Sequence, residues 1–146
     1  MDDSASQMPG FRRIAYSTLN ARQQENYNFQ KVAARLADYG FNCLRLTDDW
    51  QGADFLACHI DGQTVLKVQL KGRLTIDRKY QGRAIHIAFL HGGDCYLYPH
   101  DEVLKSIRAS GVMNEDSERW RDAGLRNWPR PPAWAMELLA PYRLEQ

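Results

Sequence analysis

The sequence predicts a single α/β domain in which a central mixed β-sheet is flanked by helices. One stretch with helical spacing, residues 21–38, precedes five short segments of alternating apolar residues, and a second helical stretch follows them. A chain of 146 residues has the usual size of one domain and can bury a hydrophobic core without disulfides. Elements in this order predict helices packed on a sheet with both parallel and antiparallel neighbours.

Composition and charge are those of an ordinary globular protein. Hydrophobic residues make up 44% and charged residues 25% of the chain, which argues against a disordered polypeptide. The longest apolar runs are far shorter than the roughly 20 residues that a membrane-spanning helix needs. The acidic start Met1-Asp2-Asp3 is unlike a secretory signal, and Cys43, Cys58 and Cys95 lack C-x-x-C spacing. These features predict a cytoplasmic protein with free thiols and no membrane partner.

The first helix, residues 21–38, carries signals at both ends. Asn20 is a good N-cap with Gln23 in the capping-box position, and Gly40 supplies the stop. Apolar residues at the i, i+3, i+4, i+7 spacing form its buried stripe, namely Phe29, Val32, Ala33 and Leu36. Residues 1–18 show no period and are expected to form a flexible arm.

Strands are expected where apolar and polar residues alternate, at residues 42–46, 53–60, 64–73, 84–89 and 95–98. Residues 47–52 are predicted as a polar loop. Asp61-Gly62-Gln63 predicts a hairpin, because Asp-Gly accommodates positive φ. A second helix opens at Pro99-His100, with acids in its first turn and Gly111 beyond its end.

The organisation that follows is an arm at residues 1–18, a core at 19–111 and a C-terminal extension at 112–146. Within the extension, residues 118–123 and 134–139 have short helical patterns separated by an extended, proline-rich break. The extension is expected to pack on the core or at a dimer contact. Its candidates for either role are Trp120, Trp128 and Trp134.

The hairpin gathers the residues best suited to chemistry. Side chains at i and i+2 of a strand share a face, so Gln69 and Lys71 lie side by side, with Leu70 facing the other way. With the turn at residues 61–63, antiparallel pairing brings Asp54 roughly opposite them. A carboxylate, an amide oxygen and an ammonium group therefore converge, which suits metal-assisted hydrolysis of a phosphodiester.

A hard cation such as Mg²⁺ prefers oxygen ligands, which Asp54 and the Gln69 side chain supply, together with the backbone carbonyl of Leu70. Such an ion stabilises charge on the phosphate and lowers the pKa of a bound water, and Mn²⁺ can substitute for it. Lys71 is expected to hold or deprotonate the attacking water, or to stabilise the transition state. Glu25 shares the apolar stripe of the first helix, where a carboxylate is costly unless it is paired or binds a metal, so it is expected at the same ion.

The segment Gly52-Ala53-Asp54-Phe55-Leu56-Ala57, the hairpin and Val68-Gln69-Leu70-Lys71 resemble the core of the PD-(D/E)XK nuclease superfamily. That superfamily has an acid on one strand, then an acid or Gln, any residue and Lys on the next, after a helix that often bears Glu. The resemblance covers roughly residues 20–100. It implies a restriction-endonuclease-like or Holliday-junction-resolvase-like fold and a Mg²⁺-dependent endodeoxyribonuclease of defence, repair or recombination. The implied catalytic residues are Asp54, Gln69, Lys71 and Glu25, and the implied metal ligands are Asp54, Gln69 and Glu25.

A basic segment near the hairpin is expected to bind nucleic acid. The net charge is only +1, but cations cluster at Lys67, Arg73, Arg78, Lys79 and Arg83, where they can track phosphates. Tyr80 within this segment is expected to stack on bases. DNA is the expected partner, with RNA left open. Cutting both strands of a duplex usually takes two sites, so a homodimer is expected if that is the task.

Two alternatives remain open. Gln69 stands where the superfamily usually has an acid, and a neutral ligand binds a cation more weakly, so the chain can be a nuclease-fold module that binds nucleic acid without cleaving it. The proline-rich segment and C-terminal aromatic residues also fit a protein-interaction domain with neither metal nor nucleic-acid affinity.

Overall fold

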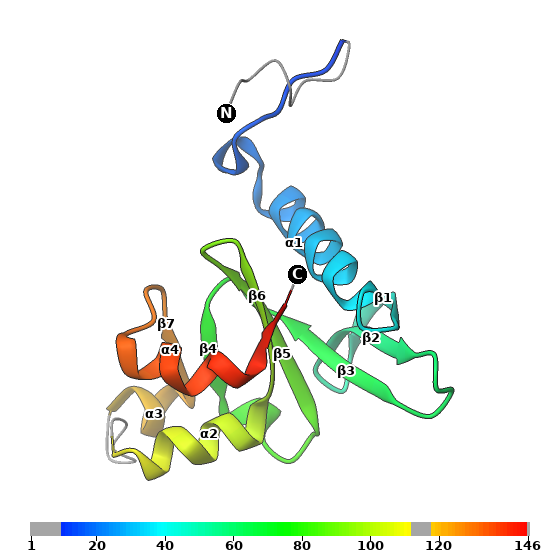
Figure 1. The fold of residues 1–146 in the computed structure, drawn as a ribbon. Helices are drawn as coiled ribbons and strands as arrows, with labels where there is room; N and C mark the ends of the chain where they lie inside the picture. The colour runs from blue at the N-terminus through cyan, green and yellow to red at the C-terminus, as the bar shows by residue number, and fades with distance from the viewer. Residues whose placement is uncertain (1–9, 112–117, 146) are drawn as a thin grey trace.

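The structure, a computed structural model, describes residues 10–111 and 118–145. Six strands form the central sheet in the order β1-β2-β3-β5-β6-β8, with β3 and β5 parallel and the other neighbours antiparallel. Strands β4 and β7 form a separate antiparallel pair. A mixed sheet with flanking helices confirms the predicted α/β class (Figure 1).

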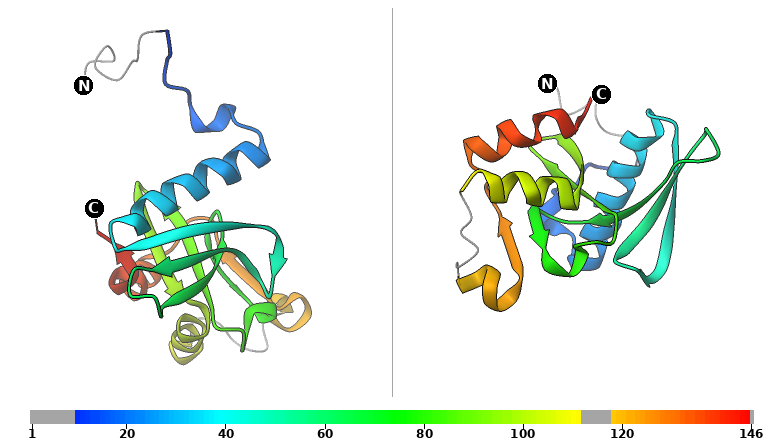
Figure 2. Two further views of the ribbon diagram at one scale, coloured as in Figure 1. Left: turned by 90° about the vertical axis from the view of Figure 1, so that its right-hand side faces the viewer. Right: turned by 90° about the horizontal axis from the view of Figure 1, so that it is seen from below.

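The helices and strands are labelled in Figure 1. In chain order they are α1 (Ala21–Ala37), β1 (Phe41–Trp50), β2 (Ala53–His59), β3 (Val65–Leu70), β4 (Leu74–Asp77), β5 (Ile85–His91), β6 (Asp94–Pro99), α2 (His100–Ala109), α3 (Glu118–Ala123), β7 (Leu125–Trp128), α4 (Ala133–Leu139) and β8 (Arg143–Leu144). Short 3₁₀ helices lie at Tyr16–Thr18, Arg78–Tyr80 and Ala140–Tyr142. Figure 2 shows α1 on one side of the sheet, with α2 and α4 on the other.

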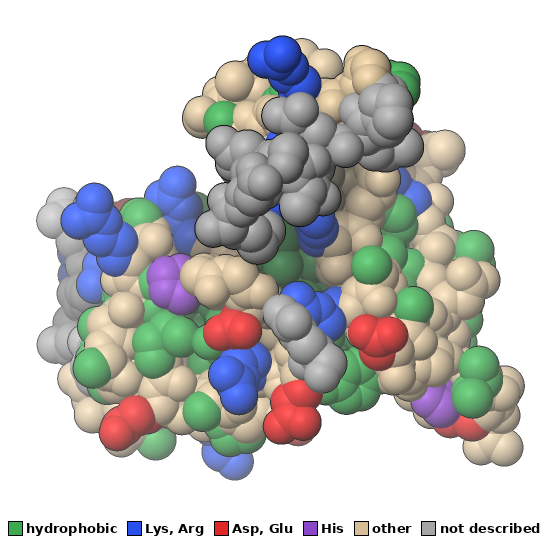
Figure 3. All heavy atoms as spheres, turned by 45° about the horizontal axis from the view of Figure 1, so that its top comes forward, with side chains coloured by type: hydrophobic (Ala, Val, Ile, Leu, Met, Phe, Trp, Pro, Cys, Tyr) green, Lys and Arg blue, Asp and Glu red, His purple; other side chains and the backbone are tan. Residues whose placement is uncertain are grey.

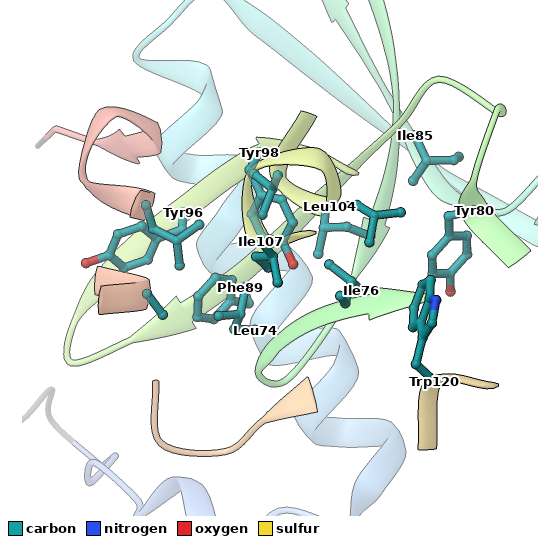
Figure 4. Close-up of a cluster of buried hydrophobic side chains, with 14 of the residues drawn as sticks. Leu74, Ile76, Tyr80, Ile85, Phe89, Tyr96, Tyr98, Leu104, Ile107 and Trp120 are labelled. Carbon is teal, nitrogen blue, oxygen red and sulfur yellow. The ribbon is translucent and has the colours of Figure 1, made fainter. Parts of the chain in front are cut away.

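The sheet separates two hydrophobic cores. On one face, Val32 and Leu36 of α1 pack on Phe55, Val68 and Ala88 of the strands. On the other face lies a larger cluster, part of which Figure 4 shows, to which the later helices contribute Val103, Leu104, Ile107, Trp120, Ala135 and Leu139. Each large apolar side chain buried in this way contributes about 1.5–3 kcal/mol. The chain from Trp120 onward is therefore part of the domain core.

Local signals placed the first helix and the hairpin correctly. The side chain of Asn20 accepts from the Gln23 backbone N–H, and the Gln23 side chain accepts from the Asn20 N–H, both at 2.9 Å. At the hairpin turn Gly62 has φ of 72°, and one carboxylate oxygen of Asp61 accepts from two backbone N–H groups, those of Gln63 and Thr64, each at 2.8 Å. These bonds satisfy the groups that a helix start and a turn leave unpaired.

The segment between the first two strands was predicted wrongly as a loop. Strand β1 continues to Trp50, which pairs with Ala53 across the two-residue turn Gln51-Gly52. Both turn residues have positive φ, 52° and 89°, the geometry that the right-handed strand twist favours in tight hairpins. Polar composition at residues 47–50 concealed a strand whose side chains are mostly exposed.

Pairings between distant segments were missed. Residues 71–73 do not continue β3; the chain leaves the sheet there, and β4 pairs with β7 in a register that joins Leu74 to Trp128. Strand β8 adds to the edge of the sheet through Cys95 and Leu144. Leu74 to Asp77 alternate apolar and polar side chains, but all four are buried and a strand of four residues is too short for the alternation to identify it.

The ends of the chain differ in how they meet the domain. Residues 1–9 of the expected arm lie outside the described residues, and Tyr16 contacts Tyr27 of α1 with ring centroids 5.2 Å apart. At the other end, Trp128 and Trp134 contact edge to face at 5.7 Å, while Trp120 is buried. Within the residues described, no helix is long and apolar enough to cross a bilayer.

Replacement of His100 by alanine is expected to lower the free energy of unfolding by about 2–4 kcal/mol, because it leaves a cavity and an unpaired backbone donor. His100 is fully buried; its Nε2 accepts from the Asp77 N–H and its Nδ1 lies by an Asp101 carboxylate oxygen, each at 2.9 Å. The ring thus joins β4 to α2. Urea denaturation measures the change, with the exposed Lys105→Ala on the same helix as control; a loss below 1 kcal/mol would contradict this role.

Candidate active site

A cavity of about 640 Å³ lies between α1 and the ends of the first three strands. Helix α1 contributes Arg22, Glu25, Asn26 and Phe29; β1 contributes Arg45, Leu46, Thr47, Asp48 and Asp49; and Asp54, Phe55 and Leu70 complete the wall. Its volume is in the range of about 300–1,000 Å³ that ligand sites occupy. Carboxylates and guanidinium groups therefore face one space, at the position where the sequence predicted chemistry.

Asp54 lies where β2 and β3 cease to pair through their backbones. The last recorded partners are Phe55 and Val68, and one residue further on the Asp54 carboxylate accepts from the Leu70 N–H at 2.9 Å. This places Asp54 beside the residue between Gln69 and Lys71, as predicted. Partial burial is the main cause that raises its pKa above the usual 3.8; the Leu70 N–H and Lys71 oppose the rise, and Glu25 and Asp49 add to it.

Gln69 is buried on the sheet face opposite Val68. It pairs in register with Ile87 of β5, and its side-chain oxygen Oε1 has no hydrogen-bond partner in the described part of the chain. An orphaned buried oxygen is costly and is a recognised mark of a missing ion or water. Gln69 is not among the residues that line the cavity, so a cation between it and Asp54 would require its side chain to turn.

Lys71 follows the last residue of β3 and extends along the ring of Tyr80, with its Nζ 5.4 Å from the ring centroid. Partial burial is the main cause that lowers its pKa from 10.5, with help from Lys79. The carboxylates of Asp54, Asp77 and Asp49 act in the opposite direction. Lys71 is thus a half-buried ammonium group within the electrostatic reach of Asp54, as the motif required.

Glu25 requires a correction. It was placed on the buried stripe of α1, but its side chain is exposed, so burial gives no reason for it to bind a metal. It does line the cavity with Asp54, and its charge raises the Asp54 pKa. The face of α1 that carries Glu25 opens into the cavity, which Phe29 also lines, because the stripe becomes fully buried only from Val32 onward.

The donor chemistry fits a hard cation, although the side chains are not gathered around one point. Among the described residues, no three His, Cys, Asp or Glu side chains lie close enough together to hold an ion. The Lys71 N–H donates to the Ala88 carbonyl of β5, whereas the Leu70 N–H donates to Asp54 on the opposite side of β3. In a strand the N–H and C=O of one residue point to the same side, so the Leu70 carbonyl also points toward Asp54. Mg²⁺ selects oxygen donors, and the donors available here are the Asp54 carboxylate, the Leu70 carbonyl and the exposed Glu25 carboxylate.

Asp49 is the residue that the sequence reading overlooked. It lines the cavity with Asp54, its charge acts on both Asp54 and Lys71, and its Oδ1 accepts from the Gly52 N–H at 2.8 Å. It also borders a smaller hollow with Lys79 and Arg83. The adjacent acids at positions 48 and 49, directly before the hairpin, were the available signal.

The predicted nucleic-acid contacts divide into two groups. Tyr80 is only 2% exposed, so it cannot stack on a base, and that prediction was wrong. Arg78 donates to the backbone carbonyls of Trp120 and Arg121 and lies over the Trp120 ring, so its guanidinium group holds α3 in place.

The remaining cations are accessible. Lys67 lies 3.5 Å from the Gln51 side chain, Arg73 lies 3.4 Å from that of Asn127, and Lys79 and Arg83 are exposed. Figure 3 shows basic and acidic side chains mingled on the face that it presents. Charges of both signs are therefore mixed on this face.

Comparison with protein-family models, with curated proteins and with solved structures found no match for this chain.

Proposed function

We propose that this chain is a metal-dependent nuclease of the PD-(D/E)XK type that hydrolyses phosphodiester bonds in DNA. The observation that carries the proposal is the hydrogen bond from the Leu70 N–H to the Asp54 carboxylate. Leu70 stands between Gln69 and Lys71 in the chain, and both Leu70 and Asp54 line a cavity of about 640 Å³. The surrounding Arg22 and Arg45 supply positive charge for a phosphate.

The roles of the residues follow from their positions. Asp54 and the Leu70 carbonyl would hold Mg²⁺, with Glu25 or Asp49 as a further carboxylate and Gln69 after a rotamer change. The ion would supply Lewis-acid stabilisation of the phosphate and a more acidic water. Lys71 would orient the attacking water or neutralise charge on the phosphate, and partial burial lowers the pKa of its ammonium group from the usual 10.5.

Cleavage is directly testable. Purified protein incubated with supercoiled plasmid and Mg²⁺ or Mn²⁺ is expected to convert it to nicked or linear DNA, and chelation by EDTA is expected to stop the reaction. A parallel incubation with RNA separates the two substrates. If no metal supports cleavage of supercoiled, linear or branched DNA, or of RNA, the catalytic proposal is rejected.

A second function, binding of nucleic acid without cleavage, is favoured by two observations. The acids near Asp54 do not form a ready metal cluster in the described chain, and position 69 carries a neutral amide. Such a module would bind DNA in EDTA with a strong dependence on salt. It would also bind equally well after Asp54→Asn, and no metal would restore cleavage.

The proposed oligomeric state and cellular compartment follow from the proposed function and from the sequence. A chain with one site needs a second copy to cut both strands at one position, so a nuclease that linearises DNA is expected to be a homodimer. Sedimentation in the presence of DNA tests this. The three cysteines are free thiols, in keeping with a cytoplasmic setting.

A further inference from the structure

A second cavity, of about 440 Å³, adjoins the proposed active site along a different stripe of α1. Its wall consists of Tyr16, Tyr27, Asn28, Lys31, Arg35, Lys71, Gly72, Leu90 and Gly93. The two cavities lie near each other at the end of β3, where the consecutive residues Leu70 and Lys71 line the first and the second. A polynucleotide bound at Asp54 therefore passes close to the second cavity.

The charged side chains that line the second cavity are all cationic. Lys31, Arg35 and Lys71 line it, and its described wall contains no aspartate or glutamate. The first cavity, in contrast, has both signs of charge. The ammonium group of Lys71 lies by Tyr80 and is offset by nearby carboxylates, so the cations that remain for a ligand of this cavity are Lys31 and Arg35. Two such cations in a wall without acids favour an anionic ligand, and a phosphate is the anion to which Arg and Lys are best matched.

The same cavity offers accessible aromatic surface. Tyr16 and Tyr27 are 41% and 40% exposed, and their rings meet at 62° with centroids 5.2 Å apart. The Nζ of Lys31 lies 5.2 Å from the Tyr27 centroid, so charge and ring are presented together. Aromatic faces beside phosphate-binding cations are the means by which proteins hold unpaired nucleotides.

We propose that the second cavity binds one unpaired nucleotide adjacent to the cleaved bond, with the base on Tyr27 and a phosphate between Lys31 and Arg35. The placement next to the cleaved bond rests on the proposed nuclease function, whereas nucleotide binding itself does not. Bases within a duplex are stacked and cannot reach a side pocket without being extruded. The substrate class is therefore nucleic acid with a single-stranded segment, such as an overhang, a gap or a flap.

The test measures binding in EDTA, where cleavage does not interfere, by fluorescence anisotropy of a labelled single-stranded oligonucleotide. Tyr27→Ala is expected to raise Kd about 10-fold, and Tyr27→Phe, which keeps the ring, is expected to stay within about 2-fold. Lys31→Gln is expected to weaken binding and to lower the salt dependence by about one phosphate contact. Thermal unfolding of each variant verifies that the fold is kept.

A matched control is Lys105→Gln, which removes an exposed charge from α2 on the far side of the sheet and is expected to leave Kd unchanged. Tyr27→Ala is expected to spare binding of a blunt duplex. The subsite is overturned if Tyr27→Ala binds the single strand like the wild type, or weakens strand and duplex equally. If binding depends on Tyr27 but no metal supports cleavage, the subsite is kept and the nuclease function is rejected. If DNA is cleaved but neither binding nor cleavage depends on Tyr27, the nuclease function is kept and the subsite is rejected.

Discussion

Lys71→Met is expected to lower the rate of DNA cleavage by roughly 100- to 1000-fold while DNA binding changes by less than about 5-fold. The methionine keeps the length and apolar stem of the side chain but removes the ammonium group that faces Asp54 and Asp49. That group lies on the ring of Tyr80, close to the end of β3. Single-turnover cleavage of a labelled DNA with saturating protein measures the loss of the chemical step.

Stability provides an independent readout of the same variant. Burial lowers the pKa of Lys71 in the folded protein, so the unfolded chain binds the proton more tightly and the charged lysine costs stability. This cost is full below the folded pKa and disappears as the pH rises from the folded pKa toward 10.5. Lys71→Met is therefore expected to melt at or above the wild-type temperature at pH 7, with the difference shrinking in alkali.

The exposed Lys105→Met serves as the control and is expected to cleave at the wild-type rate. Full-rate cleavage by Lys71→Met would show either that another residue carries the reaction or that the activity belongs to a contaminant. A large drop in melting temperature would instead show that Lys71 holds the fold, and the loss of cleavage would then say little about catalysis.

The parts of the fold that sequence could predict are those that depend on neighbouring residues. The hydrogen bonds by which Asn20 and Gln23 cap α1 join residues three positions apart in the sequence, and those of the Asp61-Gly62 turn span no more than that. In contrast, β4 pairs with β7 some fifty residues later, and the choice of that partner depends on the whole core. Alternation along one segment carries no information about such a pairing.

The candidate site divides in the same way. Strand alternation and the hairpin register placed Asp54 beside Leu70 and put Gln69 on the sheet face opposite Val68 and Leu70. The pattern did not predict which side chains are buried: Tyr80 is buried and Glu25 is exposed. Asp49 entered the site only because β1 runs on to Trp50, which a polar sequence did not indicate.

Asp54→Asn is expected to lower cleavage by about 1000-fold or more, because it removes the central carboxylate ligand of the proposed cation. The amide oxygen can still accept from the Leu70 N–H, so the strands keep their geometry. Wild-type protein is expected to gain stability on addition of Mg²⁺, by about 1.4 kcal/mol at ten times the dissociation constant, and the variant is expected to gain little. Calorimetry with and without Mg²⁺ measures both.

The pH dependence separates loss of a metal ligand from damage to the fold. Burial raises the pKa of Asp54 above 3.8, so the folded chain binds this proton more tightly than the unfolded chain does. The cost in stability grows as the pH rises from 3.8 and is complete above the folded pKa. Without metal, Asp54→Asn is thus expected to match the wild type in acid and to exceed it at pH 7. Mg²⁺ should offset that cost in the wild type alone. If Mg²⁺ stabilises both proteins equally, Asp54 is not a ligand, and the ion binds elsewhere on the chain.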